Sequence, residues 1–512
     1  MPGAVMEESD HNLYNLLGLG PKAKDTEIRR AFRNLVTRAH PDKGGDAARF
    51  RLIQQAYEVL SDPNKRSHYD QTGKIIKTAE EEFMDSFAGG NYRDKVRAAE
   101  TSEASNISEQ ITVRQSKEAG SHGAGFEAWM RGRGSGGVQV FTADDVIDQF
   151  GVVKGSYDAV PLPRIKAHAV RCSGAGRPRE VLGVEAEELP AELEWGQVLV
   201  SIRYAAVNPA DLYTVATGGT YGQEHVSVPF VPGHDAVGVI VKAREGTGPG
   251  VKGLHENDWV VPLKPFLGTW RSLLVAAEKD LLRLAPDAMP MEQCAVLRET
   301  LTAYRLLEDA PGLKPGDCVA LNAANSAVGQ MVLQLASLLR LRTVAVVSDD
   351  AGGDFDKTAD WLKSLGASVV LPDRGNLKAE LDKLKFFAKP KLALDAVGGL
   401  SSTRLSDMLA EGGQLVVYGC MSGKSPTWTW HSWVFQGIQV RGFNIRRWVQ
   451  EHRKRVPVLL ESIAKLVNAG KLTAAYTEYE LATEFGEALE HALERGKNTK
   501  VLLKVSDVGV QY

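Results

Sequence analysis

The stretch from Asn322 to Gln330 reads NAANSAVGQ, and it decides how the second half of the chain is interpreted. An apolar run from Cys318 to Leu321 precedes it, and an amphipathic run from Met331 to Leu339 follows it. A β-like run from Thr343 to Val347 comes next. A strand, a turn of small residues, a helix and a second strand are the opening of a dinucleotide-binding unit. Small residues let the backbone approach a pyrophosphate, which the first N–H groups and the dipole of the helix stabilise.

Length and composition limit the class of protein. A chain of 512 residues is too long for one ordinary core, so two to four domains are expected. The net charge of -3 at pH 7 gives no overall reason to expect nucleic-acid or membrane binding, and no apolar run approaches the roughly 20 residues that span a bilayer. The acidic N-terminal stretch, MPGAVMEESDHN, predicts no secretory or transit peptide at that end.

The cysteines are few and lie far apart. They form no CxxC pair, which argues against a disulfide framework or a closed zinc site and favours a reducing compartment. The four are Cys172, Cys294, Cys318 and Cys420.

Residues 1–85 have the pattern of a small helical module. Asp25 and Thr26 can cap a helix whose apolar positions recur at helical spacing. After the turn HPDKGGD, another helix is expected from about Ala47 to Leu60. The first of these two helices has a basic face opposite its apolar positions. This face carries Arg29, Arg30, Arg33 and Arg38.

From YNLLGL to FRLIQQAYEVLSDPNKRSHYD, with HPD between them, this module resembles the J domain of DnaJ-type co-chaperones. In that family the HPD loop triggers ATP hydrolysis by a DnaK-type chaperone. The resemblance therefore implies that His40, Pro41 and Asp42 bind such a chaperone. A basic helix face suits docking on an acidic partner surface. The alternative is an ordinary helical hairpin with a solvated basic face.

Residues 86–160 are rich in Gly, Ser and charged residues, and they predict a flexible linker. Short β-like runs separated by turn residues begin at Ile165, and they indicate an antiparallel, barrel-like domain. A barrel, then a nucleotide unit, then a C-terminal return segment resembles the medium-chain dehydrogenase/reductase superfamily. The expected fold is multidomain: a small all-α J domain, a GroES-like β-barrel-type catalytic domain (161–300 and 448–512), and a doubly wound Rossmann α/β domain (301–447).

Residue types argue against a metal. Zinc members of this superfamily need a thiolate among converging ligands. The segment AAVNPADLY has Asn208 and Pro209 where a cysteine would be wanted, and PGHDAVG offers His234 and Asp235 without a thiolate. We therefore predict no metal, and we expect His234 to be a hydrogen-bonded structural residue.

Further motifs narrow the resemblance to the mitochondrial-type 2-enoyl thioester reductases, over about 165–505. They are NPADLY, ATGGTYG, PGHDAVG, LGTWRS, LTAYRLL, NAANSAVGQ, LDAVGG and VVYGCM. The resemblance implies reduction of an enoyl-CoA or enoyl-acyl carrier protein in fatty-acid synthesis, with Tyr221 as the proton donor. The developing enolate needs both stabilisation and a proton. The alternative role for Tyr221 is an aromatic residue that covers the cleft.

The resemblance also implies a set of cofactor-binding residues. The pyrophosphate turn is Asn325, Ser326, Ala327 and Val328. Ser348, Asp349 and Asp350 follow the second strand of the nucleotide unit. The remaining positions are Tyr418, Gly419, Cys420, Met421, Phe443, Asn444, Ile445 and Lys500.

Three positions depart from the family. Glu299, Thr300 and Leu301 replace NPC, whose Asn contacts the cofactor. Asn444 replaces the Trp of an FW pair at the acyl tunnel. Ser348, Asp349 and Asp350 replace arginines that clamp the NADPH 2′-phosphate. Acids there favour the ribose hydroxyls of NADH, whereas the family favours NADPH. We expect NADPH, with NADH as the alternative.

Two other functions stay open: a co-chaperone with a degenerate reductase domain, and a zinc-free quinone or enone reductase. The expected partners are a thioester of coenzyme A or acyl carrier protein, a DnaK-type chaperone and a second copy of the chain, with no nucleic acid and no membrane span. The basic run RRWVQEHRKR suits the phosphates of coenzyme A or an acidic carrier protein, or is a solvated helix face. The expected compartment is the cytoplasm, with the mitochondrion as the alternative.

Overall fold

The computed structural model describes most of the chain outside the long Gly-rich segment. The described residues are 12–39, 47–76, 79–80, 82–83, 87, 164–219, 225–244, 253–285, 288–310, 312–348, 354–384 and 388–506. The chain divides into two units, Met1–Glu82 and Phe83–Tyr512. None of the helices in the described ranges is long and apolar enough to cross a membrane.

The described part of the first unit contains α1 (Leu13–Leu16), α2 (Asp25–Ala39), α3 (Ala47–Ser61) and α4 (Pro63–Thr72). Ile28 of α2 and Ile53 of α3 are fully buried in its core. The rings of Phe32 and Tyr57 stack with their centroids 4.0 Å apart. The predicted basic face of α2 is exposed at Arg29, Arg30 and Arg33. Arg38 lies in the last turn of α2 with its side chain not described, and the HPD loop (His40, Pro41 and Asp42) lies outside the described residues.

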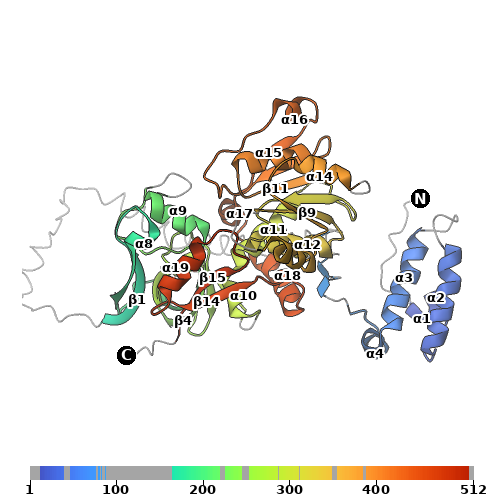
Figure 1. The fold of residues 1–512 in the computed structure, drawn as a ribbon. Helices are drawn as coiled ribbons and strands as arrows, with labels where there is room; N and C mark the ends of the chain where they lie inside the picture. The colour runs from blue at the N-terminus through green and yellow to red at the C-terminus, as the bar shows by residue number, and fades with distance from the viewer. Residues whose placement is uncertain are drawn as a thin grey trace, which may run out of the picture. The chain divides into compact units, whose positions relative to one another are not determined.

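The second unit begins its regular structure with a two-stranded sheet, β1 (Arg164–Cys172) with β2 (Leu182–Pro190), and a larger sheet of seven strands. The larger sheet has the order β14-β15-β3-β4-β5-β7, and β6 also pairs with β3. Figure 1 shows the C-terminal strands, in red, joining the green strands of the first third of this unit. The strands are β3 (Gln197–Ala206), β4 (Ala236–Ala243), β5 (Trp259–Pro262), β6 (Leu273–Ala277), β7 (Leu281–Leu284), β14 (Tyr476–Glu480) and β15 (Lys500–Lys504).

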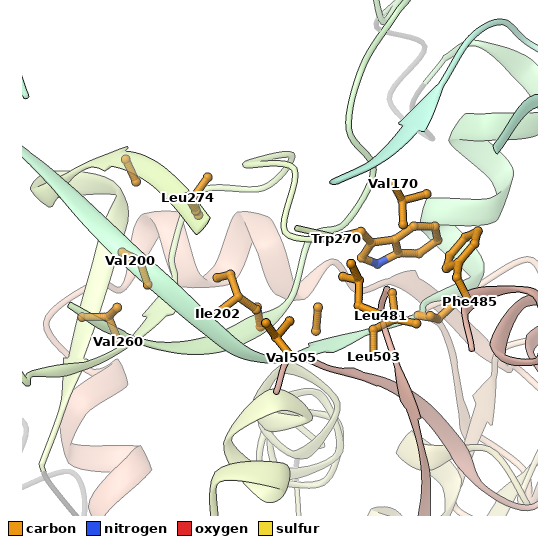
Figure 2. Close-up of a cluster of buried hydrophobic side chains, with 14 of the residues drawn as sticks. Val170, Val200, Ile202, Val260, Trp270, Leu274, Leu481, Phe485, Leu503 and Val505 are labelled. Atoms are coloured by element: carbon orange, nitrogen blue, oxygen red, sulfur yellow. The ribbon is translucent and has the colours of Figure 1, made fainter. Parts of the chain in front are cut away.

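The core of this barrel-type sheet draws on segments about 300 positions apart in the sequence. Trp270 is fully buried at its centre, and its indole N–H donates to the carbonyl oxygen of Ala206 at 3.1 Å. Figure 2 shows Trp270 between Val170 and Phe485, with Leu503 nearby. The return of the chain to this sheet after residue 470 therefore completes its core.

The second sheet is parallel throughout and has the order β10-β9-β8-β11-β12-β13. Its strands are β8 (Cys318–Leu321), β9 (Arg342–Val347), β10 (Val369–Pro372), β11 (Leu392–Asp395), β12 (Gln414–Val417) and β13 (Gln439–Gly442). This is the doubly wound order, with its switch point between β8 and β11, where ligands bind beyond the carboxyl ends of the strands. The predicted strand–turn–helix–strand at 318–347 is confirmed.

The remaining helices complete the second unit. They are α8 (Pro178–Val181), α9 (Pro209–Thr217), α10 (Met291–Ala295), α11 (Leu297–Glu308), α12 (Ala327–Leu338), α13 (Phe355–Ser364), α14 (Leu377–Lys383), α15 (Gly399–Met408), α16 (Trp430–Val434), α17 (Ile445–Glu451), α18 (Val456–Asn468) and α19 (Phe485–Leu493), with a 3₁₀ turn at Glu278–Asp280.

Candidate active site

The switch point of the parallel sheet is held by a buried polar cluster that sequence reasoning missed. Asn322 follows β8, and its side-chain amide donates to Asp395 Oδ1 at 2.7 Å and to Ser401 Oγ at 2.9 Å. The same Asp395 oxygen accepts the backbone N–H groups of Val397 and Gly398, each at 3.0 Å. Both carboxyl strand ends are therefore fixed together, which gives a rigid floor to the cleft where a dinucleotide would lie.

The turn before α12 is built for a close backbone approach. A Cβ on Gly329 would lie 2.5 Å from the carbonyl oxygen of Ala324, so only glycine fits. Ser326 caps the helix by accepting the Gly329 N–H. In the described part of the chain, the N–H groups of Ala327 and Val328 have no hydrogen-bond partner, as expected for a first helical turn. This helix end suits the pyrophosphate of a dinucleotide.

Asn325, which is predicted to belong to the pyrophosphate turn, has its side-chain amide bonded to a later segment of the chain. Its amide donates to the carbonyl oxygens of Gly496 and Lys497 and to Asn498 Oδ1, each at 3.2 Å. Gln330 reinforces this contact, because its amide donates to the Asn498 carbonyl oxygen at 2.9 Å. Asn325 therefore ties the turn to the segment that leads into β15.

Lys500, the first residue of β15, lies in a buried ionic cluster. Its ammonium donates to Glu299 Oε1 at 2.5 Å and also to Asn208 Oδ1. Lys500 is 8% exposed and Glu299 9% exposed. Glu299 Oε2 is buried without a hydrogen-bond partner among the described residues. Three elements therefore meet here: β15, α11 from the start of the nucleotide half, and the N-cap of α9.

The cluster continues through Asn208 towards the barrel-type sheet. The Asn208 amide donates to Asp235 Oδ2 at 2.9 Å, and Asp235 also pairs with Arg298 of α11. Burial opposes ionisation of Asp235, but the Arg298 guanidinium outweighs it and holds the pKa of Asp235 below its usual range. Burial raises the pKa of Glu299, and Lys500 opposes that rise. The neighbouring His234 is buried and bonded to Asp211, which is the structural role predicted for it.

The other predicted cofactor positions lie at strand ends of the parallel sheet. Tyr418, Gly419, Cys420 and Met421 follow β12, and burial raises the pKa of the Tyr418 phenol. Asn444 caps α17 by accepting the N–H groups of Arg446 and Arg447 at 2.9 and 3.2 Å. This cap accounts for an Asn at a position where the family has an aromatic residue. It lies between Phe443 and Ile445.

The basic run after Asn444 is partly engaged with the protein. The Arg446 guanidinium lies over the Phe266 ring, 5.1 Å from its centroid, and Arg447 pairs with Glu451 at 2.7 Å. Arg453 donates to the Lys279 carbonyl oxygen at 3.2 Å.

Some predicted residues lie outside the described part of the chain. They are Tyr221, Asp349 and Asp350. Ser348 is exposed just beyond β9, and Lys357 pairs with Asp354 at 3.2 Å.

The residues at the positions where zinc members of the superfamily bind their metal are not suited to bind zinc. In the described ranges, no group of three or more His, Cys, Asp or Glu side chains is placed to hold a metal ion. Asn208 stands where a thiolate would be wanted, and it bonds to Asp235 and Lys500.

The Lys500–Glu299 pair should be strongly coupled. Glu299→Leu leaves a buried ammonium and Lys500→Met leaves a buried carboxylate, so each should lower the free energy of unfolding by about 3–5 kcal/mol. The double variant should lose much less than the sum of the two. Calorimetry of the full chain, following the transition of the second unit, measures this.

The control is the exposed pair formed by Glu380 and Lys383, 2.8 Å apart. Glu380→Leu and Lys383→Met should change stability by about 0–1 kcal/mol. Additive effects at Glu299 and Lys500 would contradict a coupled ion pair.

Three family models match the chain. Residues 12–70 match the DnaJ domain, residues 194–282 the alcohol dehydrogenase GroES-like domain, and residues 327–465 the zinc-binding dehydrogenase family. The predicted fold class, a helical J domain followed by GroES-like and Rossmann domains, is confirmed.

Relatives of known identity cover most of the second unit. The mitochondrial enoyl-[acyl-carrier-protein] reductase of Dictyostelium discoideum is 35% identical over 341 residues, which are 66% of this chain and 94% of that protein. The human one is 34% identical over 356 residues, 69% and 92% of the two chains. The solved Etr1p/NADP/crotonyl-CoA complex is 25% identical with a TM-score of 0.57, covering 66% of this chain and 100% of that one. The chain therefore belongs to the family of mitochondrial-type enoyl-[acyl-carrier-protein] reductases, and it carries a DnaJ domain ahead of the reductase.

Proposed function

We propose that the second unit reduces 2-enoyl thioesters of coenzyme A or acyl carrier protein, with NADPH as the hydride donor. The observation that carries the proposal is the close-packed turn before α12, fixed at the switch point of the sheet, in a member of the enoyl reductase family. The enzyme is an oxidoreductase that acts on CH–CH groups.

The cofactor would lie across the carboxyl ends of β8 and β11. Ala327 and Val328 N–H groups would hold the pyrophosphate, and the residues after β12 and β13 would flank the rest. When bound, NADPH supplies the hydride. The relative solved with NADP supports NADPH over NADH. Ser348, at the end of β9, is a hydroxyl donor suited to a 2′-phosphate.

Tyr221 would supply the proton. Hydride addition at the β-carbon places negative charge on the thioester oxygen, and a phenol can stabilise that charge and then protonate the α-carbon. The buried cluster of Lys500, Glu299 and Asn208 would position α9, which ends at Thr217, only a few residues before Tyr221.

Full-length protein should oxidise NADPH with crotonyl-CoA, and more efficiently than it oxidises NADH. Tyr221→Phe should lower kcat by about 10²–10⁴-fold, the usual contribution of a general acid. Absorbance at the nicotinamide band follows both rates. Tyr213→Phe, on the neighbouring helix α9, is the control and should keep full activity.

Two alternatives predict different results. A degenerate reductase domain would show no NADPH binding by calorimetry. A quinone reductase would turn over a quinone and not crotonyl-CoA. The quinone reductase alternative rests on the fold alone. The NADPH:quinone reductase from Bacillus thuringiensis that supports it is 22% identical to this chain, with a TM-score of 0.56.

We also propose that the DnaJ domain stimulates the ATPase of a DnaK-type chaperone. The exposed arginines of α2, Arg29, Arg30 and Arg33, support an acidic docking partner. His40→Gln should abolish stimulation of a DnaK-type ATPase by the full chain, measured as phosphate release. His68→Gln, in α4 and outside the HPD motif, should leave it unchanged; equal loss in both variants would contradict a role for the HPD loop.

We propose that the chain forms a homodimer through the parallel sheet. β13 is the end strand of that sheet, and α16 just before it exposes large apolar side chains. Trp433 is 51% exposed, and Phe435, just beyond α16, is 62% exposed. Such a patch is typical of an interface.

Trp433→Arg combined with Phe435→Glu should convert the dimer to a monomer, because charge is costly in a buried interface. Sedimentation equilibrium measures the mass. Trp195→Arg is the control, since Trp195 is 65% exposed but lies before β3. A wild-type chain that sediments as a monomer would refute the proposal.

The names of the relatives support the mitochondrion as the compartment. The cytoplasmic prediction gains no support from them. Fractionation of cells that express the protein distinguishes the two.

A further inference from the structure

An aromatic cluster forms where the DnaJ part of the chain is followed by the reductase. Phe83 lies 5.7 Å from the Tyr304 ring with the two planes at 74°, and Phe87 lies 5.5 Å from it at 70°. The Phe83 and Phe87 rings are 5.5 Å apart. Edge-to-face rings at these separations attract each other beyond their burial of apolar surface.

The Phe83 and Tyr304 rings are buried as in a protein core, and Phe87 is half-buried. Phe83 is 2% exposed and Tyr304 is fully buried, and both rank among the largest fully buried side chains of the structure. Phe83 and Phe87 are spaced i, i+4, so a single helical turn presents both rings on one face. Neither residue lies in a segment that matches a family model, since those segments are 12–70, 194–282 and 327–465.

The surface that receives them belongs to α11. Tyr304 lies in the second half of this helix, and Glu299 of the buried ionic cluster lies in its first turn. Arg305, next to Tyr304, lies over the Trp448 ring of α17, 4.7 Å from its centroid. A segment that binds Tyr304 therefore binds α11, the helix that contributes Glu299 to the buried ionic cluster and contacts α17 through Arg305.

We propose that Phe83 and Phe87 are an intramolecular anchor that holds the chain leaving the DnaJ domain on α11 of the reductase. The group that covers Tyr304 on α11 is thus the segment of the same chain that carries Phe83 and Phe87.

The anchor changes which part of the chain connects the two modules. Residues 86–160 are predicted from composition to be the linker. With Phe83 and Phe87 fixed on α11, the connection from the end of α4 at Thr72 is residues 73–82, which are ten residues. Such a stretch spans at most about 35 Å when fully extended. In sequence, residues 88–163 lie between this anchor and β1, which begins at Arg164.

The test compares two pairs of phenylalanine replacements in the full-length protein. Phe83→Ser with Phe87→Ser removes the anchor. Phe126→Ser with Phe141→Ser is the matched control, because it makes the same changes within residues 88–163. Limited proteolysis, read by mass spectrometry, gives the cleavage rate between residues 73 and 90, and hydrogen exchange gives the protection of α11.

Loss of the anchor should raise the cleavage rate about tenfold, because proteolysis follows the population of the released segment, and it should speed exchange at α11. The control pair should change neither. Phe83→Leu with Phe87→Leu should restore most of the protection, since the apolar contact is kept. Tyr304→Leu should release the same segment from the other side.

Equal cleavage rates in wild type and the Ser variant would overturn the anchor. An equal increase of the cleavage rate in the control variant, Phe126→Ser with Phe141→Ser, would also overturn it. These readouts require no turnover, so they are independent of the proposed reduction, and they remain decisive if Tyr304→Leu fails to fold.

Discussion

Lys500 imposes the constraint on which the second unit depends. An ammonium that is 8% exposed needs acceptors, and those available come from α11 and from the N-cap of α9. The hydrogen bonds of Lys500 therefore hold three elements together: β15, α11 and the loop between β3 and α9. The same meeting point fixes Asp235 and Arg298. The barrel-type sheet and the nucleotide half of the second unit are therefore linked through a buried ionic cluster centred on Lys500.

Local features could be predicted from the sequence because their causes are local. The strand–turn–helix at 318–338 follows from apolar periodicity and small residues, and the structure has it within a few positions. The helical DnaJ module follows in the same way. That the AAVNPADLY and PGHDAVG segments contain no cysteine could be read directly from the residue types.

The site could be predicted only in part, because its contacts join distant segments. Asn325 was predicted to belong to the pyrophosphate turn, but nothing in the sequence indicated that its amide bonds to residues more than 170 positions later. Glu299 and Lys500 are 201 positions apart, and no periodicity links them. From the sequence, Asn444 was only a position where the family's Trp is missing. The structure shows that Asn444 caps the start of α17. The aromatic pair at Phe83 and Phe87 fell near a boundary drawn from composition, which carries no information about a partner near residue 304.

The position of β15 has a consequence for how the protein is made. β3 ends at Ala206, and two of its antiparallel neighbours, β4 and β6, follow within about 70 residues, but the third, β15, spans Lys500–Lys504. Ribosomes add about 5–20 residues per second, so β3 waits roughly 15–60 s for that neighbour. The helices of the DnaJ domain, by contrast, have all their partners once residue 72 has been made. The nascent chain therefore contains α1 to α4 of the DnaJ domain long before the barrel-type sheet of the second unit receives β14 and β15.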